Sequence, residues 1–264
     1  MSAISPAKSV SIKRGVVTIN CPGKREAVKA LAAKMPLIML PFLGKPIIAY
    51  LLDDLAKKGV GRVRLLVSDR AEAVYAYVGA GEPWGLEVQV EEVEAEAPEE
   101  QGFEVLPQIP GIRLWDSYAS WAAALARGFQ VLTSGHIGMR TVAPGIFVAR
   151  TAFVSEEAEL VAPCWIGPNS HISANAVVGP YSVVEDGAYV DNDSHITCGI
   201  VGPRTYVGKS LDVCKSLAWG AQLVSLDDGA TINISDTFML SPIGINAGGF
   251  FDHLRMRLIS LLIS

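Results

Sequence analysis

Residues 160–190 read LVAPCWIGPNSHISANAVVGPYSVVEDGAYV, and an aliphatic residue returns at every sixth position of this stretch. The same spacing extends on both sides, slips by one residue at 197–199, and resumes at Val201, Val207 and Val213. A period of six matches neither the helical period of 3.6 nor the strand period of two. It fits short strands joined by tight corners, with the aliphatic side chain pointing inward and about three hexads closing each coil.

The predicted interior positions and the small residues expected near the corners follow the same period. The aliphatic positions are Val142, Val148, Val154, Leu160, Ile166, Ile172, Val178, Val184, Val190 and Ile196. The small residues, four positions later in the hexad, are Ala152, Ala158, Cys164, Ser170, Ala176, Ser182, Ala188 and Ser194. Strands of a β-sandwich would need more than six residues for a strand and its turn.

This pattern resembles the hexapeptide-repeat family, and the resemblance implies a left-handed parallel β-helix over residues 136–220. Beyond it, apolar and polar residues alternate around Asp228–Gly229, a dipeptide typical of tight hairpin turns. We therefore predict a capping β-hairpin over residues 221–245, because an open coil end would expose unpaired strand edges.

The first part of the chain predicts a small α/β module over residues 10–135, with a parallel sheet and helices on its faces. A helix over 117–127 would be capped by Asp116 or Ser117 and ended by Gly128. The other predicted elements are strands at 16–19, 63–67 and 86–93 and a helix at 47–58 followed by Gly59. The acidic stretch 91–104 is expected to be a solvated linker.

Residues 36–69, with Gly44–Lys45–Pro46 before a helix, and residues 112–126 resemble segments of the sugar-nucleotide nucleotidyltransferases. The resemblance implies a Rossmann-like catalytic module followed by a hexapeptide β-helix, in activated-sugar or cell-envelope polysaccharide metabolism. It also implies nucleotide binding by Gly23, Lys24, Arg25, Gly44 and Lys45. The alternative is that these are surface cations and turn glycines.

Three departures from that family predict reduced catalysis. The phosphate loop reads NCPGKR at residues 20–25 and offers few free backbone N–H groups. Leu37 stands where the family has a lysine, and the central portion with its metal-binding aspartate is missing. We therefore expect a protein that binds a nucleotide or sugar phosphate, or acts as a scaffold, with weak or no turnover.

Two other functions stay open. One is an active sugar-1-phosphate nucleotidyltransferase with an altered site, which would use Mg²⁺. The other is a hexapeptide acyltransferase that uses acyl-CoA, with His171 or His195 as general base. These histidines are 24 residues apart, so they are expected on neighbouring faces. No metal site is predicted, because the oxygen-rich turn at 191–193 has no further ligand at a fixed spacing.

The net charge, the cysteines and the last residues of the sequence predict the partners and the location of the protein. The net charge of −5 argues against nucleic acid, and four scattered cysteines predict a reduced, cytoplasmic compartment. Residues 246–264 predict an amphipathic helix too short to cross a bilayer. We expect a homo-oligomer formed through the β-helix or this helix. A membrane-associated partner or a further C-terminal portion is also considered, which would place the protein at the inner face of the membrane.

Overall fold

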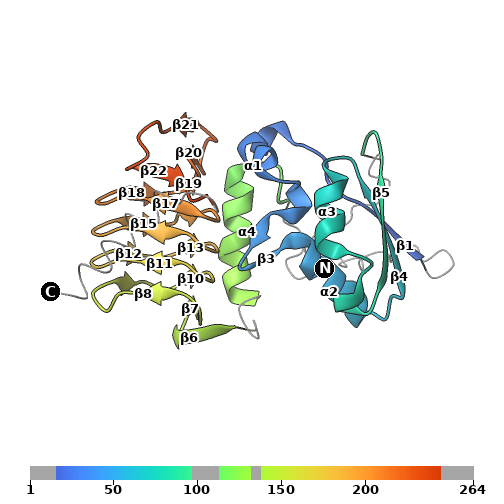
Figure 1. Cartoon of the computed structure of the whole chain (residues 1–264), viewed down its shortest axis with the longest axis horizontal. Helices are drawn as coiled ribbons and strands as arrows, with labels where there is room; N and C mark the ends of the chain where they lie inside the picture. Colours follow the sequence, from blue (N-terminus) through green and yellow to red (C-terminus); the bar gives the residue numbers. More distant parts are fainter. Residues whose placement is uncertain (1–15, 97–112, 132–137, 245–264) are drawn as a thin grey trace, which may run out of the picture. The chain divides into compact units, whose positions relative to one another are not determined.

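A computed structural model describes residues 16–96, 113–131 and 138–244 of the chain (Figure 1). Its contacts divide the chain into two compact units, Met1–Arg127 and Gly128–Ser264. Within the described ranges, no helix is long and apolar enough to cross a membrane. The helix predicted over 246–264 lies outside the described residues.

The sheet of the first unit is parallel, as predicted, with the order β1-β4-β5. Its strands are β1 (Val16–Asn20), β4 (Arg62–Val67) and β5 (Glu87–Glu92). In β4 every second side chain, from Val63 to Val67, is buried. This alternation lets one face of the sheet join the core while the other carries arginines and glutamates.

Four α-helices, three short 3-10 helices and a two-stranded hairpin accompany this sheet in the described part of the chain, and α3 packs against β5. The helices are α1 (Lys29–Lys34), α2 (Ile47–Lys57), α3 (Ala71–Val78), α4 (Tyr118–Val131), η1 (Glu26–Val28), η2 (Leu37–Met39) and η3 (Glu82–Trp84). The hairpin joins β2 (Pro41–Phe42) to β3 (Lys45–Pro46).

The predicted helix starts and ends are confirmed in part. Gly59 follows α2 with a φ of 75°, which only glycine adopts without strain. The Ser117 hydroxyl accepts the Ser120 N–H at 3.0 Å and so caps α4, as predicted. The predicted end of α4 at Gly128 is wrong, because the helix continues to Val131. A glycine costs a helix only about 1 kcal/mol, and burial of Phe129 in the following position compensates for it.

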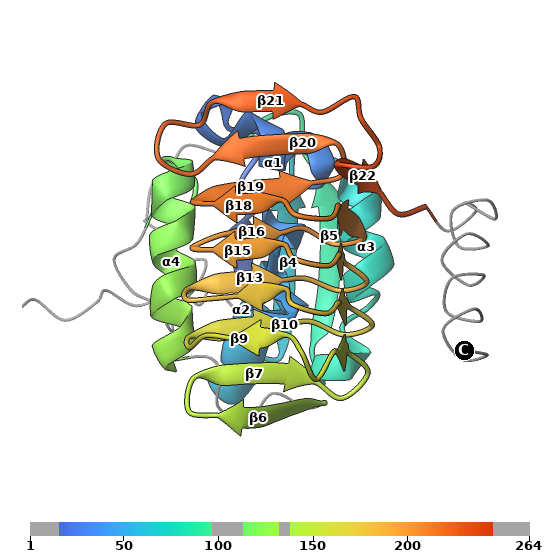
Figure 2. The same cartoon turned by 90° about the vertical axis from the view of Figure 1, so that its left-hand side faces the viewer.

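The second unit consists of short strands that join three sheets in turn (Figure 2). Strands three apart in the sequence are parallel neighbours, so Cys164 pairs with Ser182, His171 with Tyr189 and Val177 with His195. Each circuit of the three sheets therefore advances the chain by one repeat of three hexads. This arrangement of short parallel strands is compatible with a β-helix.

Within the described residues, the short strands of the second unit are distributed over three sheets. The first sheet contains β6 (Met139–Ala143), β7 (Ile146–Ala149), β10 (Cys164–Ile166), β13 (Ser182–Val184), β16 (Ile200–Val201), β19 (Ser216–Trp219), β20 (Gln222–Ser225) and β21 (Thr231–Asn233). The second contains β8 (Phe153–Val154), β11 (His171–Ile172), β14 (Tyr189–Val190), β17 (Thr205–Val207) and β22 (Leu240–Pro242). The third contains β9 (Glu159–Leu160), β12 (Val177–Val178), β15 (His195–Thr197) and β18 (Asp212–Cys214).

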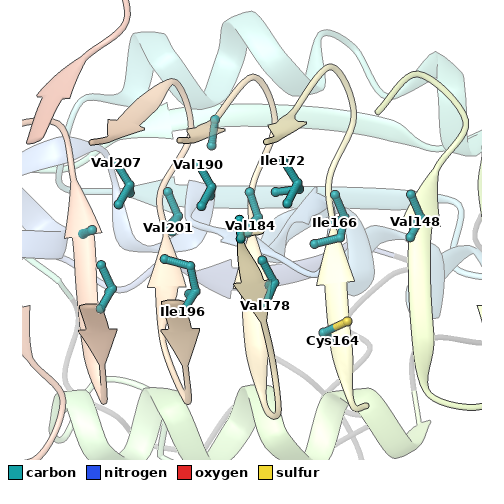
Figure 3. Close-up of a cluster of buried hydrophobic side chains, with 14 of the residues drawn as sticks. Val148, Cys164, Ile166, Ile172, Val178, Val184, Val190, Ile196, Val201 and Val207 are labelled. Carbon is teal, nitrogen blue, oxygen red and sulfur yellow. The ribbon is translucent and has the colours of Figure 1, made fainter. Parts of the chain in front are cut away.

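The interior of the coils is filled by the predicted aliphatic positions (Figure 3). The positions from Ile166 to Val213 are buried, whereas Val154 and Leu160 are half-buried against the same cluster. The small residues also fit as predicted, and the hydroxyl of Ser194 donates to the carbonyl of Gly208 at 2.6 Å. One position is wrong: Val142 is 55% exposed, because β6 runs antiparallel to β7 and takes no part in the circuit.

The predicted phase slip at 197–199 is a corner with one residue fewer. Beyond it the pairing advances by 17 residues, as in Val183 with Ile200. A second short corner occurs at Lys215, so that Ile200 pairs with Leu217; the sequence analysis did not predict it. The predicted hairpin around Asp228–Gly229 is formed by β20 and β21. An additional tight hairpin joins β19 to β20 at residues 220–221.

Candidate functional site

The carboxyl ends of β1, β4 and β5 bring three loops to one edge of the parallel sheet, the position where open α/β sheets bind ligands. Residues 21–25 follow β1, residues 68–70 follow β4, and residues 93–96 follow β5. The main chain ties the loops to the sheet, because Cys21 N–H donates to Leu66 O at 2.8 Å and Val93 N–H to Val67 O at 3.0 Å.

The loop of residues 21–25 grips a single carboxylate. The N–H of Gly23 donates to Glu96 Oε2 at 3.0 Å. Arg25 donates from Nη1 to Oε2 at 2.6 Å and from Nη2 to Oε1 at 2.7 Å. The hydrogen bonds from Arg25 lower the pKa of Glu96 most, the Gly23 N–H adds to them, and burial opposes both. Charge-assisted, two-pronged contacts of this kind are among the strongest that a guanidinium makes.

Glu96 was not identified by the sequence analysis, which assigned the acidic stretch to a solvated linker. The structure places Glu91 and Glu92 in β5, and Glu96, on the segment after β5, contacts the loop after β1, so the linker prediction is wrong for these residues. Residues 97–104 of the predicted linker lie outside the described residues. A glutamate in an acidic run carries no local signal of a partner 71 residues earlier in the sequence.

Gly23 leaves little space for a side chain. A Cβ atom there would lie 2.8 Å from Ser68 Oγ and 3.4 Å from Glu96 Oε2. A larger residue at this position would therefore require the Ser68 hydroxyl to move.

A second carboxylate at the same edge, Asp69, is held in place by its neighbour. Arg70 donates from Nε to Asp69 Oδ1 at 3.1 Å and from Nη2 to Oδ2 at 2.8 Å. Arg70 Nη2 also donates to Ala32 O at 2.5 Å. Lys24 lies 3.7 Å from Asp69 Oδ1, and its side chain is 72% exposed. Lys24 is thus the most solvent-accessible cation of the predicted loop residues.

Cys21, the first residue of the loop, is unsuited to nucleophilic chemistry. Its thiol is buried, and burial, with a smaller contribution from Glu96, raises its pKa to about 12. The thiolate is the reactive form of cysteine, so this side chain acts as a small apolar residue of the core.

The structure does not connect Gly44 and Lys45 to the loop of residues 21–25. Gly44 forms the turn of the β2–β3 hairpin with a φ of 85°. Lys45 Nζ lies 2.5 Å from Asp53 Oδ2 and 4.3 Å from the centre of the Tyr50 ring. Across the described ranges, no hydrogen bond or ion pair joins Lys45 to the loop.

Leu37, noted in the sequence as a leucine in place of an expected lysine, has a buried side chain. Leu37 begins the short helix η2 and is completely buried. An ammonium group at this buried position would lose its hydration, so the burial favours leucine over lysine.

The two candidate histidines lie on different sheets of the second unit, as predicted from their spacing. His171 belongs to β11, and its ring stacks between Phe153 and Tyr189 at 4.5 Å from each ring centre. Burial lowers the pKa of His171, and Asp191 partly opposes this shift. Its ring faces are occupied by aromatic neighbours, which favours a structural role.

His195 belongs to β15 and has a more open setting. Its Nδ1 lies 2.9 Å from Asp212 Oδ1, and the two side chains are 52% and 78% exposed. The neighbouring turn is engaged elsewhere: Asp191 accepts the Tyr206 hydroxyl at 2.7 Å, and Asp193 accepts the Asn175 amide at 3.1 Å. Within the described ranges, no group of three or more potential metal-ligating side chains is assembled.

No model of a known protein family matches the chain, and no curated protein matches it either.

Proposed function

We propose that the first unit binds a phosphate group of a nucleotide or sugar phosphate at the loop of residues 21–25. The observation that carries this proposal is the convergence of the Gly23 N–H and the Arg25 guanidinium on one anion. Two oxygens of a phosphate present the same paired acceptors to a guanidinium as a carboxylate does. The position at the carboxyl edge of a parallel sheet also favours ligand binding.

The proposal also includes the fold of each unit and the metabolic role that the family resemblance implies. The first unit would be a reduced nucleotidyltransferase-type module, and the second a left-handed parallel β-helix of the hexapeptide type. The circuit of parallel strands through three sheets and the buried aliphatic column support the second assignment. The role would then lie in activated-sugar or polysaccharide metabolism.

Weak or absent nucleotidyl transfer is the expected catalytic state. Nucleotidyl transfer depends on positioned cations that stabilise the charge on the phosphates. Leu37 supplies no charge, and the loop offers one glycine amide, which Glu96 engages. Mg²⁺ would accompany the nucleotide only if transfer took place.

The proposal is tested by titrating the protein with nucleoside triphosphates, sugar 1-phosphates and pyrophosphate, in buffer containing Mg²⁺. We expect binding that Arg25→Ala weakens about tenfold or more, since hydrogen bonds to charged groups contribute about 1.5–3 kcal/mol. Arg62→Ala is the matched control, because Arg62 pairs with Glu87 at the opposite, amino end of β4. No binding of any of these compounds at millimolar concentration would overturn the proposal.

A second candidate function, acyl transfer from acyl-CoA, is favoured by the pairing of His195 with Asp212. An Asp212 carboxylate that accepts from Nδ1 leaves Nε2 as the basic nitrogen, the arrangement that general-base catalysis requires. By the family resemblance, the acyl-CoA groove would form between subunits of a homotrimer. An acetyl-CoA-dependent activity that His195→Gln abolishes and His171→Gln retains would support it. A monomer in solution, with no such activity, would argue against it.

A further inference from the structure

We propose that Glu96 is a built-in competitor of the ligand's anionic group: its carboxylate occupies the anion position of the loop of residues 21–25 and must leave before a phosphate binds. This inference rests on the proposed function and assigns the residue that sets the affinity of that site. It follows from the hydrogen bonds that the loop already makes to Glu96, from the close packing at Gly23, and from the position of Glu96 beyond the paired part of the sheet.

One side chain, that of Glu96, accepts three hydrogen bonds from the loop. The Gly23 N–H and Arg25 Nη1 both point at Oε2, while Arg25 Nη2 points at Oε1. An incoming phosphate would need the same donors in the same directions. The carboxylate and the phosphate therefore exclude each other at Gly23 and Arg25.

Steric packing strengthens this exclusion. Even a methyl group on Gly23 would meet both Ser68 Oγ and Glu96 Oε2. A phosphate that used the Gly23 N–H and the Arg25 guanidinium would have to take the place of the Glu96 carboxylate. Like charges at this distance would add electrostatic repulsion to the steric conflict.

Glu96 can withdraw without disturbing the sheet. In the described structure, the last main-chain hydrogen bond from the β5 segment to β4 is made by Val93, three residues before Glu96. Release of the Glu96 side chain would therefore break its own contacts with Gly23 and Arg25 and leave the pairing of β4 with β5 intact. Ligand binding would therefore cost the ion pair with Arg25 and the hydrogen bond from Gly23.

The other carboxylate at this edge behaves differently. Asp69 is buried and accepts hydrogen bonds from two nitrogens of Arg70, so its carboxylate is held in a fixed position. Glu96 is held by the very groups that would bind the ligand. Of these two carboxylates, only Glu96 therefore competes directly with an anion. Lys24 would be available to a second phosphate group.

The test is calorimetric titration of the full chain with pyrophosphate, comparing the wild type with Glu96→Gln and Glu96→Ala. We expect both variants to bind pyrophosphate about tenfold more tightly than the wild type, which corresponds to about 1.4 kcal/mol. Glu94→Gln is the matched control, since Glu94 is exposed two residues away and loses the same charge. It measures the general electrostatic gain from removing one negative charge.

The outcomes separate the two proposals. If the wild type binds pyrophosphate and neither Glu96 variant binds more tightly than Glu94→Gln, Glu96 is not a competitor, while the proposed binding function stands. If the Glu96 variants bind and the wild type does not, Glu96 is a competitor, but the wild-type protein does not bind the phosphate compound and the proposed function fails. If none of the proteins binds, and circular dichroism shows that all are folded, the proposed function fails and the competitor with it.

Discussion

The two units of this protein fold by different rules. In the second unit, one short rule is repeated, and each buried aliphatic residue meets its equivalents one circuit before and after it. In the first unit, the edge of the sheet is built from segments that follow three different strands, and its ion pair joins residues 71 positions apart. The repeat makes the fold of the second unit predictable from the sequence. The candidate site depends on contacts between distant residues, which no local sequence pattern indicates.

Two glutamates show the same difference in electrostatic terms. Glu185, at a corner of the coil, is 3% exposed, and burial raises its pKa to about 8, with a smaller contribution from Asp186. The pKa of Glu96 is shifted in the opposite direction because Arg25 and Gly23 bind its charged form. Among the described residues, no ion pair reaches the buried Glu185, whereas Arg25 supplies a cation to the partly solvated Glu96.

The largest expected effect is a loss of coil stability at alkaline pH. The folded-state pKa of Glu185 lies above its ordinary value of 4.5, so its contribution is fully present below that value and is lost as the pH rises through about 8. We expect the free energy of unfolding to fall by a few kcal/mol between about pH 5 and pH 9. Urea unfolding across this range measures it. Glu185→Gln should remove most of the decline; an unchanged profile in this variant would contradict the assignment.

The next effect compares two valines with the same place in the sequence period. Val184 is fully buried in the coil, whereas Val142 is exposed in β6. Val184→Ala is expected to lower the free energy of unfolding by about 2 kcal/mol, from lost methyl burial and the cavity left behind. Val142→Ala should change it by less than about 0.5 kcal/mol. Equal losses in denaturant unfolding would show that the period alone, and not the circuit, decides burial.

The smallest effect concerns the ion pair of the first unit. Arg25→Gln is expected to lower the stability by about 1 kcal/mol or less at neutral pH, because the pair is partly solvated. Since the pKa of Glu96 is lowered, the contribution of the pair is present above the ordinary value of 4.5 and disappears as the pH falls through the folded-state value. Thermal unfolding of the variant and the wild type should therefore converge in acid. A difference that persists there would assign the loss to packing.

The repeated features of the second unit could be predicted from the sequence more fully than the features that depend on distant contacts. The interior of the β-helix-like unit and its phase slip were predictable because a period of six leaves few ways to bury the aliphatic residues. The hairpin was predictable because Asp228–Gly229 favours a tight turn. Val142 was misassigned because it keeps the period while its strand reverses direction. The continuation of α4 through Gly128 was missed because burial of Phe129 outweighs a local helix-stop signal.

The sequence by itself determined the parallel sheet of the first unit, the stacked strands of the second and the cationic loop at residues 23–25, because these depend on short-range patterns of burial and charge. Only the tertiary structure decided that Arg25 and Gly23 grip Glu96, that Lys45 turns to Asp53, and that His195 meets Asp212. The physical reason is that a charged side chain takes its partner from whatever the chain brings within a few ångströms, and that proximity is set by packing of the whole unit.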